Sequence, residues 1–318
     1  MYLSRRYAKM ISPKRRSLML YKQEIEKLKK EKNAVIVAHS YQTLEVQDLA
    51  DVVGDSLELS RYCAAGNAGT IVFCGVLFMA ESAKILSPDK KVLLPEIDAG
   101  CPMADMADAK ALREMKKKHP DATVVCYINS SAEVKAESDI CCTSSNAVKI
   151  VSSIENDKIL FVPDRNLGSY VSSMVPEKEI ILWDGFCPIH DRLTAKTVRE
   201  MKVKHPKAVV VAHPECLPEV LAEADYIGST KRIIEYVVES SEEEFIIATE
   251  KGVVDRLERM TEGKRIYLAD NRMLCKNMKK TTPEKVIDAL RYDRYEITLE
   301  KEVIDAAAGC LERMMELS

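Results

Sequence analysis

Three cysteines at nearly equal spacing are the residues of this chain best suited to holding a metal centre. Cys101, Cys187 and Cys275 are separated by 86 and 88 residues, and each follows a strand-like apolar run. Cysteine thiolates are the usual ligands of iron–sulfur clusters, and a cluster with four irons takes four of them when every iron is bound by protein. Three equivalent cysteines therefore predict a [4Fe–4S] cluster in which one iron lacks a protein ligand.

An iron without a protein ligand could bind a substrate oxygen and act as a Lewis acid, which would assist loss of hydroxide in a dehydration. The closest metal alternative is a zinc site formed by the same three cysteines and His190, three residues after Cys187. The remaining seven cysteines have no equivalents at matched positions, and in a reducing cytosol we expect them to be buried thiols rather than disulfides. These are Cys63, Cys74, Cys126, Cys141, Cys142, Cys216 and Cys310.

Polar residues recur at matched positions in the same three parts of the chain. Three apolar runs, 34–42, 123–131 and 208–216, each carry two polar residues near their ends, and a hydroxyl residue follows the first of these by 17 positions. The matched sets are His39, Tyr127 and His213; Tyr41, Asn129 and Glu215; and Ser56, Ser144 and Thr230. Four matched landmarks in three copies, with the cysteines as the fourth, indicate an internal repeat.

These residue types suit binding and proton transfer to a small anionic substrate. Tyr41 and Glu215 form a candidate acid–base pair if the repeats close on one another, and His39 is the next candidate. The hydroxyls of Ser56, Ser144 and Thr230 are expected to cap helices and to offer donors to an anion. The repeat thus predicts one central site rather than three separate ones.

Each repeat has the pattern strand, helix, short strand, helix, strand, helix, strand. Alternating units of this kind predict parallel sheets with helices on both faces, and ligands lie beyond the C-terminal ends of such strands. We therefore expect an α/β protein of three pseudo-threefold-related α/β/α sandwich domains with the active site at their junction. The expected boundaries are 17–101, 102–187 and 188–275, with residues 276–318 forming C-terminal helices that pack back on the array.

Composition excludes several other classes of protein. The 318 residues include 47 Lys and Arg against 50 Asp and Glu, and 47% of the chain is hydrophobic. This balance is typical of a soluble globular enzyme and makes nucleic acid an unlikely partner. The apolar run 71–80 is too short for a membrane helix. The basic segment 1–16 lacks the apolar core of a secretory signal and is expected to be a solvated arm.

Several strings of the chain resemble the quinolinate synthase family, over residues 17–290. They are VIVAHSYQTLEVQDLADVVGDSLELS, FMAESAKIL, LPEIDAGCPMAD, YINSSAEVKAESDICCTSSNAV, FVPDRNLGSYV, HPEC, ADYIGST and CKNMKKTTPEKV. The resemblance implies a cytoplasmic transferase of NAD biosynthesis that condenses iminoaspartate (iminosuccinate) with dihydroxyacetone phosphate to quinolinate, phosphate and water. It also implies an oxygen-sensitive [4Fe–4S] cluster, held by three cysteines within a triangular array of three domains.

The resemblance assigns roles to individual positions. Cys101, Cys187 and Cys275 match the cluster ligands, and Tyr41 matches the tyrosine of the catalytic loop. The positions that match substrate contacts are His39, Ser56, Tyr127, Asn129, Ser144, His213, Glu215, Ser229 and Thr230. A homo-oligomer, and a transient contact with an aspartate oxidase or aspartate dehydrogenase, stay open. The competing classes are another iron–sulfur hydro-lyase and a non-catalytic protein that binds zinc or a cluster.

Overall fold

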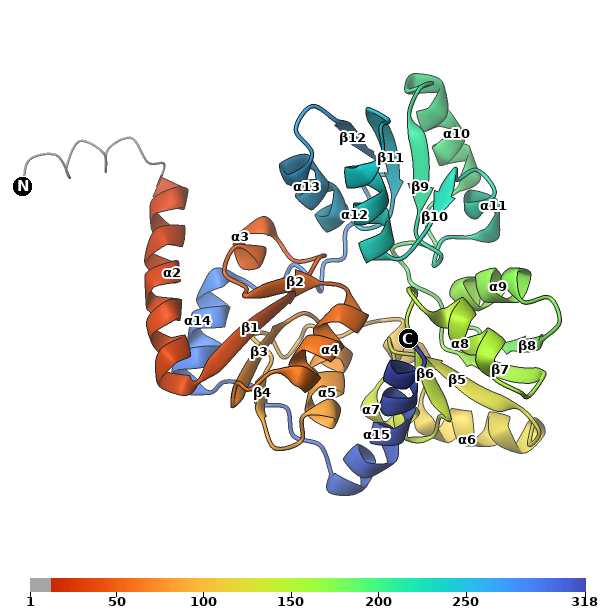
Figure 1. Cartoon of the computed structure of the whole chain (residues 1–318), viewed down its shortest axis with the longest axis horizontal. Helices are drawn as coiled ribbons and strands as arrows, with labels where there is room; N and C mark the ends of the chain where they lie inside the picture. Colours follow the sequence, from red (N-terminus) through yellow and green to blue (C-terminus); the bar gives the residue numbers. More distant parts are fainter. Residues whose placement is uncertain (1–12) are drawn as a thin grey trace, which may run out of the picture.

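Three four-stranded parallel sheets surround a common centre in the computed structural model, which describes residues 13–318 (Figure 1). The strands of the first sheet are β1 (Ala34–His39), β2 (Val52–Gly54), β3 (Thr70–Cys74) and β4 (Lys91–Leu93). The second sheet has β5 (Thr123–Tyr127), β6 (Ile140–Cys142), β7 (Lys158–Val162) and β8 (Glu179–Leu182). The third has β9 (Val209–Ala212), β10 (Tyr226–Ile227), β11 (Glu244–Ala248) and β12 (Arg265–Leu268). The predicted α/β class and its three parallel sheets are confirmed.

Helices connect the strands and cover both faces of the sheets. The first sheet has α2 (Pro13–Lys32), α3 (Leu44–Gln47), α4 (Ser56–Ala65) and α5 (Leu77–Leu86). The second has α6 (Ala109–Lys118), α7 (Ala132–Ala136), α8 (Ala147–Ser153) and α9 (Arg165–Met174), preceded by a 3₁₀ turn at Ala104–Met106. The third has α10 (Ala195–Lys204), α11 (Pro218–Leu221), α12 (Thr230–Glu239) and α13 (Lys251–Met260). None of the helices in the described part of the chain has the length and apolar character that a membrane span requires.

The core explains why the strands are short apolar runs rather than alternating ones. Neighbouring residues of β1 face different apolar clusters: Ile36 packs toward α2, whereas Val37 packs toward α4 and α5. Successive side chains of a strand point to opposite faces, so a sheet covered on both sides needs apolar residues at every position. The same two-sided burial holds for β9, where Val210 and Val211 lie in separate clusters.

The strand order is the same in all three sheets: second, first, third, fourth. The first and third strands are therefore neighbours whose connections leave in opposite directions, and this is where parallel sheets bind ligands. His39 ends β1, Tyr127 ends β5 and His213 follows β9 directly. The fold thus places one matched residue of each repeat at the ligand-binding edge of its own sheet.

Two further helices follow the third sheet and return to the array. Helix α14 (Pro283–Tyr292) packs on α2, and α15 (Lys301–Glu316) packs on α5, α7 and β6 (Figure 1). The buried face of α15 includes Leu311 and Met314, which join the first and second sheets into one continuous core. Most of the basic segment predicted to be a solvated arm lies outside the described residues. Its last four residues, 13–16, belong to α2.

Candidate active site

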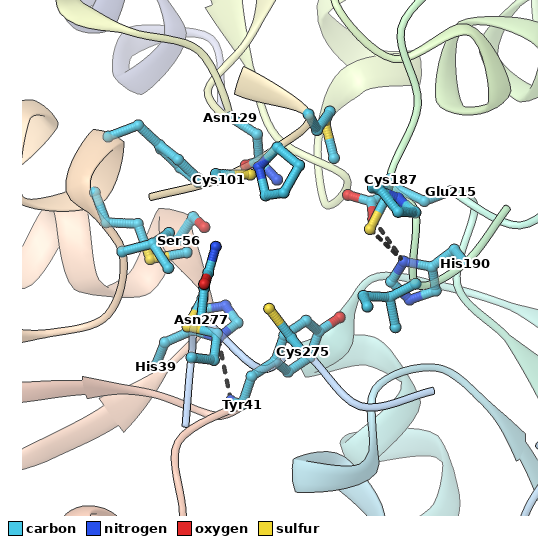
Figure 2. A pocket seen from close by; sticks show the side chains of 18 of the residues that line it. His39, Tyr41, Ser56, Cys101, Asn129, Cys187, His190, Glu215, Cys275 and Asn277 are labelled. Carbon is cyan, nitrogen blue, oxygen red and sulfur yellow. Dashed lines mark hydrogen bonds and ion pairs between the residues drawn. The ribbon is translucent and has the colours of Figure 1, made fainter. Parts of the chain in front are cut away.

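A cavity of about 360 Å³ lies where the C-terminal edges of the three sheets meet (Figure 2). Its wall includes twelve of the thirteen site residues expected from the sequence. They are His39, Tyr41, Ser56, Cys101, Tyr127, Asn129, Ser144, Cys187, His213, Glu215, Thr230 and Cys275. Ser229 is the exception. The apolar part of the wall includes Val76, Phe78 and Met278, so the cavity combines a polar set of side chains with a partly apolar surface.

The three matched cysteines enter this cavity from three sides (Figure 2). Each is partly exposed, whereas all seven of the other cysteines are buried. Within residues 13–318, the three thiols do not form a close group of ligand atoms of the kind that could hold a single metal ion. A single zinc ion with bonds of about 2.3 Å would need them closer together, so the three-cysteine zinc alternative is not assembled here. Thiols that are spread around a cavity fit a larger cluster, in which each cysteine binds a different iron.

Although each of these cysteines is partly exposed to the cavity, desolvation by the surrounding protein favours the protonated thiol in the metal-free chain. It raises the pKa of Cys101 to about 12, and it raises the pKa of Cys187 and Cys275 as well. Metal ligation requires the thiolate, so binding of a metal centre would release these protons.

Two histidines occupy equivalent positions with the same hydrogen bond. His39 Nδ1 accepts from the backbone N–H of Tyr41 at 3.1 Å, and His213 Nδ1 accepts from that of Glu215 at 3.3 Å. This contact leaves the proton on Nε2 in both rings. Burial lowers the pKa of each histidine to about 3. Both are therefore neutral donors, and the Nε2 of His213 lies 3.2 Å from the Ser144 hydroxyl.

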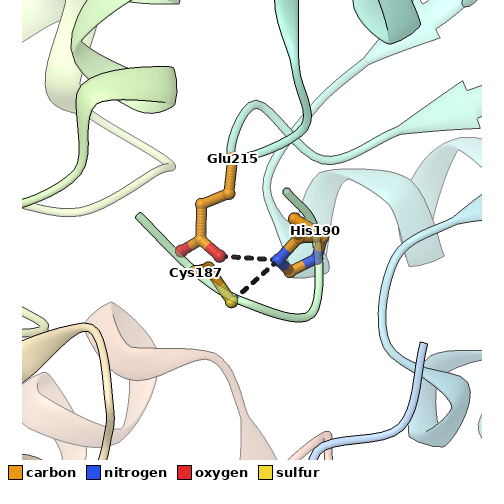
Figure 3. Close-up of side chains that lie close together, drawn as sticks. All are labelled: Cys187, His190 and Glu215. Atoms are coloured by element: carbon orange, nitrogen blue, oxygen red, sulfur yellow. Dashed lines mark hydrogen bonds and ion pairs between the residues drawn. The ribbon is translucent and has the colours of Figure 1, made fainter. Parts of the chain in front are cut away.

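Glu215 is the most heavily contacted acid of the cavity. Its carboxylate accepts from the Tyr127 hydroxyl at 2.6 Å and pairs with His190 Nδ1 at 2.7 Å (Figure 3). Burial alone would raise the pKa of Glu215. The neighbouring His213 and His190 rings, together with the hydrogen bonds from His190 and Tyr127, outweigh burial and hold this pKa below its usual range. The carboxylate form is therefore favoured. In contrast, burial raises the pKa of Tyr127 well above its usual value.

A chain of hydrogen bonds connects Glu215 to Tyr41 through two intervening side chains. The Tyr41 hydroxyl lies 3.0 Å from the Thr249 hydroxyl, which lies 2.9 Å from His190 Nε2. With His190 Nδ1–H directed at Glu215, each donor along this path meets an acceptor. Burial and the Glu215 charge raise the pKa of Tyr41 well above its usual value. Thr249 could not be found by comparing the repeats, because no other repeat carries a hydroxyl at its position.

His190 also approaches Cys187, with Nδ1 at 3.3 Å from the sulfur. Cys187, His190 and Glu215 are the one group within residues 13–318 whose ligand atoms lie close enough to hold a single metal ion. Figure 3 shows that they converge on one point between two segments of chain. A zinc ion bound by His190 in this structure would therefore have Glu215 and one cysteine, Cys187, as its other ligands, rather than three cysteines.

The expected capping role of the three hydroxyl residues is wrong. Asp55 and Ser229 are the caps of α4 and α12, so Ser56 and Thr230 are the first residues inside those helices. Ser144 lies two residues before Asn146, the cap of α8. The hydroxyls are consequently free to face the cavity, whereas Ser229 accepts from the backbone N–H of Arg232 and lies outside the cavity wall.

One buried polar atom on the cavity wall points to a ligand. The side-chain oxygen Oδ1 of Asn129 is buried without a hydrogen-bond partner among the described residues. Buried acceptors are nearly always satisfied, because an unmet one costs about 1–3 kcal/mol. A bound group with a donor would satisfy this atom.

Comparison with known proteins places the chain in a family. The family model described as "Quinolinate synthetase A protein" matches residues 23–316. A quinolinate synthase of Caldicellulosiruptor bescii is 56% identical over 301 residues, which cover 95% of this chain and 99% of the relative. One from Alkaliphilus metalliredigens is 53% identical over 92% of this chain and 97% of the relative. One from Methanoregula boonei is 52% identical over 94% and 98%, respectively. With the family model matching almost from end to end, the chain belongs to the quinolinate synthetase A protein family.

Proposed function

We propose that this chain is a quinolinate synthase, a cytoplasmic transferase of NAD biosynthesis that condenses iminoaspartate with dihydroxyacetone phosphate to give quinolinate, phosphate and water. The proposal draws on family membership, since the relatives named above carry this name. It also draws on the cavity, whose neutral and acidic polar groups suit a small anionic substrate and several proton transfers.

The observation that carries the proposal is the placement of the cysteines. Three thiols from equivalent positions of three repeats line one cavity, while the other seven are buried elsewhere. Cys101, Cys187 and Cys275 would hold a [4Fe–4S] cluster. Such a cluster, when bound, supplies one open iron that acts as a Lewis acid on a substrate oxygen.

Local donors, rather than the overall field of the protein, would bind the substrate carboxylates. The net charge of −3 repels anions weakly, so affinity must come from groups inside the cavity. Neutral His39 and His213 offer Nε2–H donors, and Ser56 and Thr230 offer hydroxyls at the first turns of α4 and α12. Helix N-termini favour anions because their free N–H groups and dipole are positive.

Tyr41 and Glu215 would carry the proton transfers. Tyr41 holds its proton and can donate it, whereas Glu215 is ionised and can accept one. Thr249 and His190 connect the two groups, so that a proton taken up on one side of the cavity can be replaced from the other. His39, which contacts Tyr41 edge-on, is positioned to orient the same part of the substrate.

The test is an anaerobic assay with both precursors. The chain is purified without oxygen, its iron is quantified, and quinolinate is measured after iminoaspartate and dihydroxyacetone phosphate are supplied. We expect quinolinate only when both precursors are present. Iron-loaded protein that forms no quinolinate but dehydrates a hydroxy acid would contradict the proposal and favour another hydro-lyase.

A further inference from the structure

Two buried carboxylates outside the reaction chemistry contact the backbone of two of the three cavity cysteines. Asp164 Oδ2 accepts from the N–H of Cys187 at 3.1 Å, and Glu250 Oε1 accepts from the N–H of Cys275 at 3.0 Å. Both side chains are fully buried. Each lies at the C-terminal end of the third strand of its sheet, 23 and 25 residues before its cysteine.

The second oxygen of each carboxylate caps the helix that follows. Asp164 Oδ1 accepts from the N–H of Leu167 at the start of α9, and Glu250 Oε2 accepts from that of Gly252 at the start of α13. One rigid side chain therefore ties each cysteine loop to a helix terminus and to a central strand. Such a contact fixes where the sulfur lies, because it fixes the backbone that carries it.

The first repeat lacks this device. Val76 occupies the equivalent position and caps α5 without a side-chain hydrogen bond. The Cys101 loop is held instead by Asn277, two residues after Cys275, whose side chain donates to the carbonyl of Gly100 at 2.8 Å. The Cys275 loop thus supports the Cys101 loop, and Glu250 supports both.

We propose that Asp164 and Glu250 are positioning residues for the metal centre: each holds one cysteine loop in place so that the three thiols can bind one cluster. This inference rests on the proposed [4Fe–4S] cluster. It predicts that loss of either carboxylate loosens its own cysteine and not the other. It also predicts that loosening the Cys275 loop affects more of the site than loosening the Cys187 loop, since the Cys275 loop also supports the Cys101 loop.

Serine separates the two roles of each acid. It caps helices about as well as aspartate does, but its shorter side chain cannot also reach the cysteine N–H. The test variants are Asp164→Ser and Glu250→Ser. The matched control is Asp108→Ser, because Asp108 caps α6 through Ala111 in the same way but contacts no cysteine. Asp164→Asn, which keeps the shape of the side chain, replaces Asp164→Ser if the latter does not fold.

The first readout is backbone hydrogen exchange in the metal-free full chain, resolved to single amides. Loss of the hydrogen bond that holds a buried cysteine N–H should speed exchange at that amide about 10-fold. Asp164→Ser should do so at Cys187 alone, and Glu250→Ser at Cys275, with Cys101 affected to a smaller extent. Unchanged exchange at the cysteine concerned would overturn the proposal.

The second readout is iron loss from the anaerobically reconstituted chain to a chelator. Residues that orient metal ligands typically change metal affinity by about 10- to 100-fold when replaced. Both test variants should therefore lose iron at least about 10-fold faster than the parent and Asp108→Ser. A parent that binds no iron would refute the proposed cluster itself. A parent that holds iron no longer than the two test variants would refute only their positioning role.

Discussion

Glu215 and Tyr41 have opposite protonation tendencies in one cavity although both are buried. Burial raises the pKa of both side chains, but Glu215 also receives hydrogen bonds from Tyr127 and lies beside two histidines, which reverse the direction. For Tyr41, burial and the nearby Glu215 charge outweigh the hydrogen bonds with Thr230 and Thr249, so the side chain keeps its proton. Groups whose surroundings separate their pKa values in this way can act as acid and base at the same pH.

Replacing either group should reduce turnover while the site stays assembled. We expect Glu215→Gln and Tyr41→Phe to lose about 10²- to 10⁴-fold in turnover, the usual contribution of general acid–base catalysis. Quinolinate affinity and the cluster spectrum should stay close to those of the parent. Anaerobic kinetics would measure the loss, with Tyr62→Phe at an exposed position of α4 as the control. A variant that turns over within a few-fold of the parent would move the role elsewhere, first to His39.

The neutral histidines make stability depend on pH in a defined direction. The folded-state pKa of His213 is about 3, below the value of about 6.5 for an unfolded histidine. Between these values the unfolded chain binds more protons, so the free energy of unfolding falls as the pH falls. One such histidine contributes about 1 kcal/mol of this loss between pH 6 and pH 5.

His213→Asn should therefore show a shallower decline than the parent. Asparagine can still accept the N–H of Glu215 but does not titrate. Urea unfolding of the metal-free chain at pH 6 and pH 5 measures the difference, and His119→Asn at the end of α6 is the matched control. Equal declines for the parent and His213→Asn would show that His213 does not drive the effect.

At the scale of elements, two adjacent residues at the start of α4, and two at the start of α12, have different roles. The side chain of the cap residue accepts a hydrogen bond from a backbone N–H of the first helical turn, and the next residue faces the cavity. In α12, Ser229 accepts from Arg232 while Thr230 Oγ1 donates to the Tyr41 hydroxyl at 3.2 Å. A helix N-terminus can thus be stabilised by one residue while the next residue places its hydroxyl in the cavity.

Adjacent substitutions should separate these two effects. Thr230→Val should weaken quinolinate binding by about 1.5–3 kcal/mol, or about 10- to 150-fold in Kd, the cost of losing a hydrogen bond to a charged group. Ser229→Ala should instead lower the free energy of unfolding by about 1 kcal/mol, the usual cost of losing a cap. Calorimetry and urea unfolding on both variants distinguish them. An unchanged Kd for Thr230→Val would remove this residue from the binding site.

At the scale of the whole molecule, the site exists only where three sheets meet. The hydroxyl of Ser145 in the second repeat contacts Asp55 of the first at 2.9 Å and Ser229 of the third at 2.8 Å. The cavity wall likewise takes residues from every repeat. The site therefore forms only when the three repeats pack against one another, and hydrogen bonds across their junction stabilise that packing.

This arrangement explains what could be predicted from the sequence. The strands, the cysteines and His39, Tyr127 and His213 recur at a fixed spacing, so comparison of the repeats finds them. Thr249 and His190 act through partners in other parts of the array, and no spacing along the chain indicates such contacts. Asp164 and Glu250 share a position in two repeats. This match between two repeats indicates a shared role, but the first repeat has the apolar Val76 at the equivalent position.

The most direct test of the account is the iron and sulfide content of cysteine variants after anaerobic reconstitution. The parent and Cys310→Ala, which changes a buried thiol, should each bind one [4Fe–4S] cluster per chain. Cys101→Ala, Cys187→Ala and Cys275→Ala should bind almost none, because each removes one of three ligands from the cavity. Equal iron and sulfide in all five proteins would contradict the claim that the three repeats converge to hold one cluster.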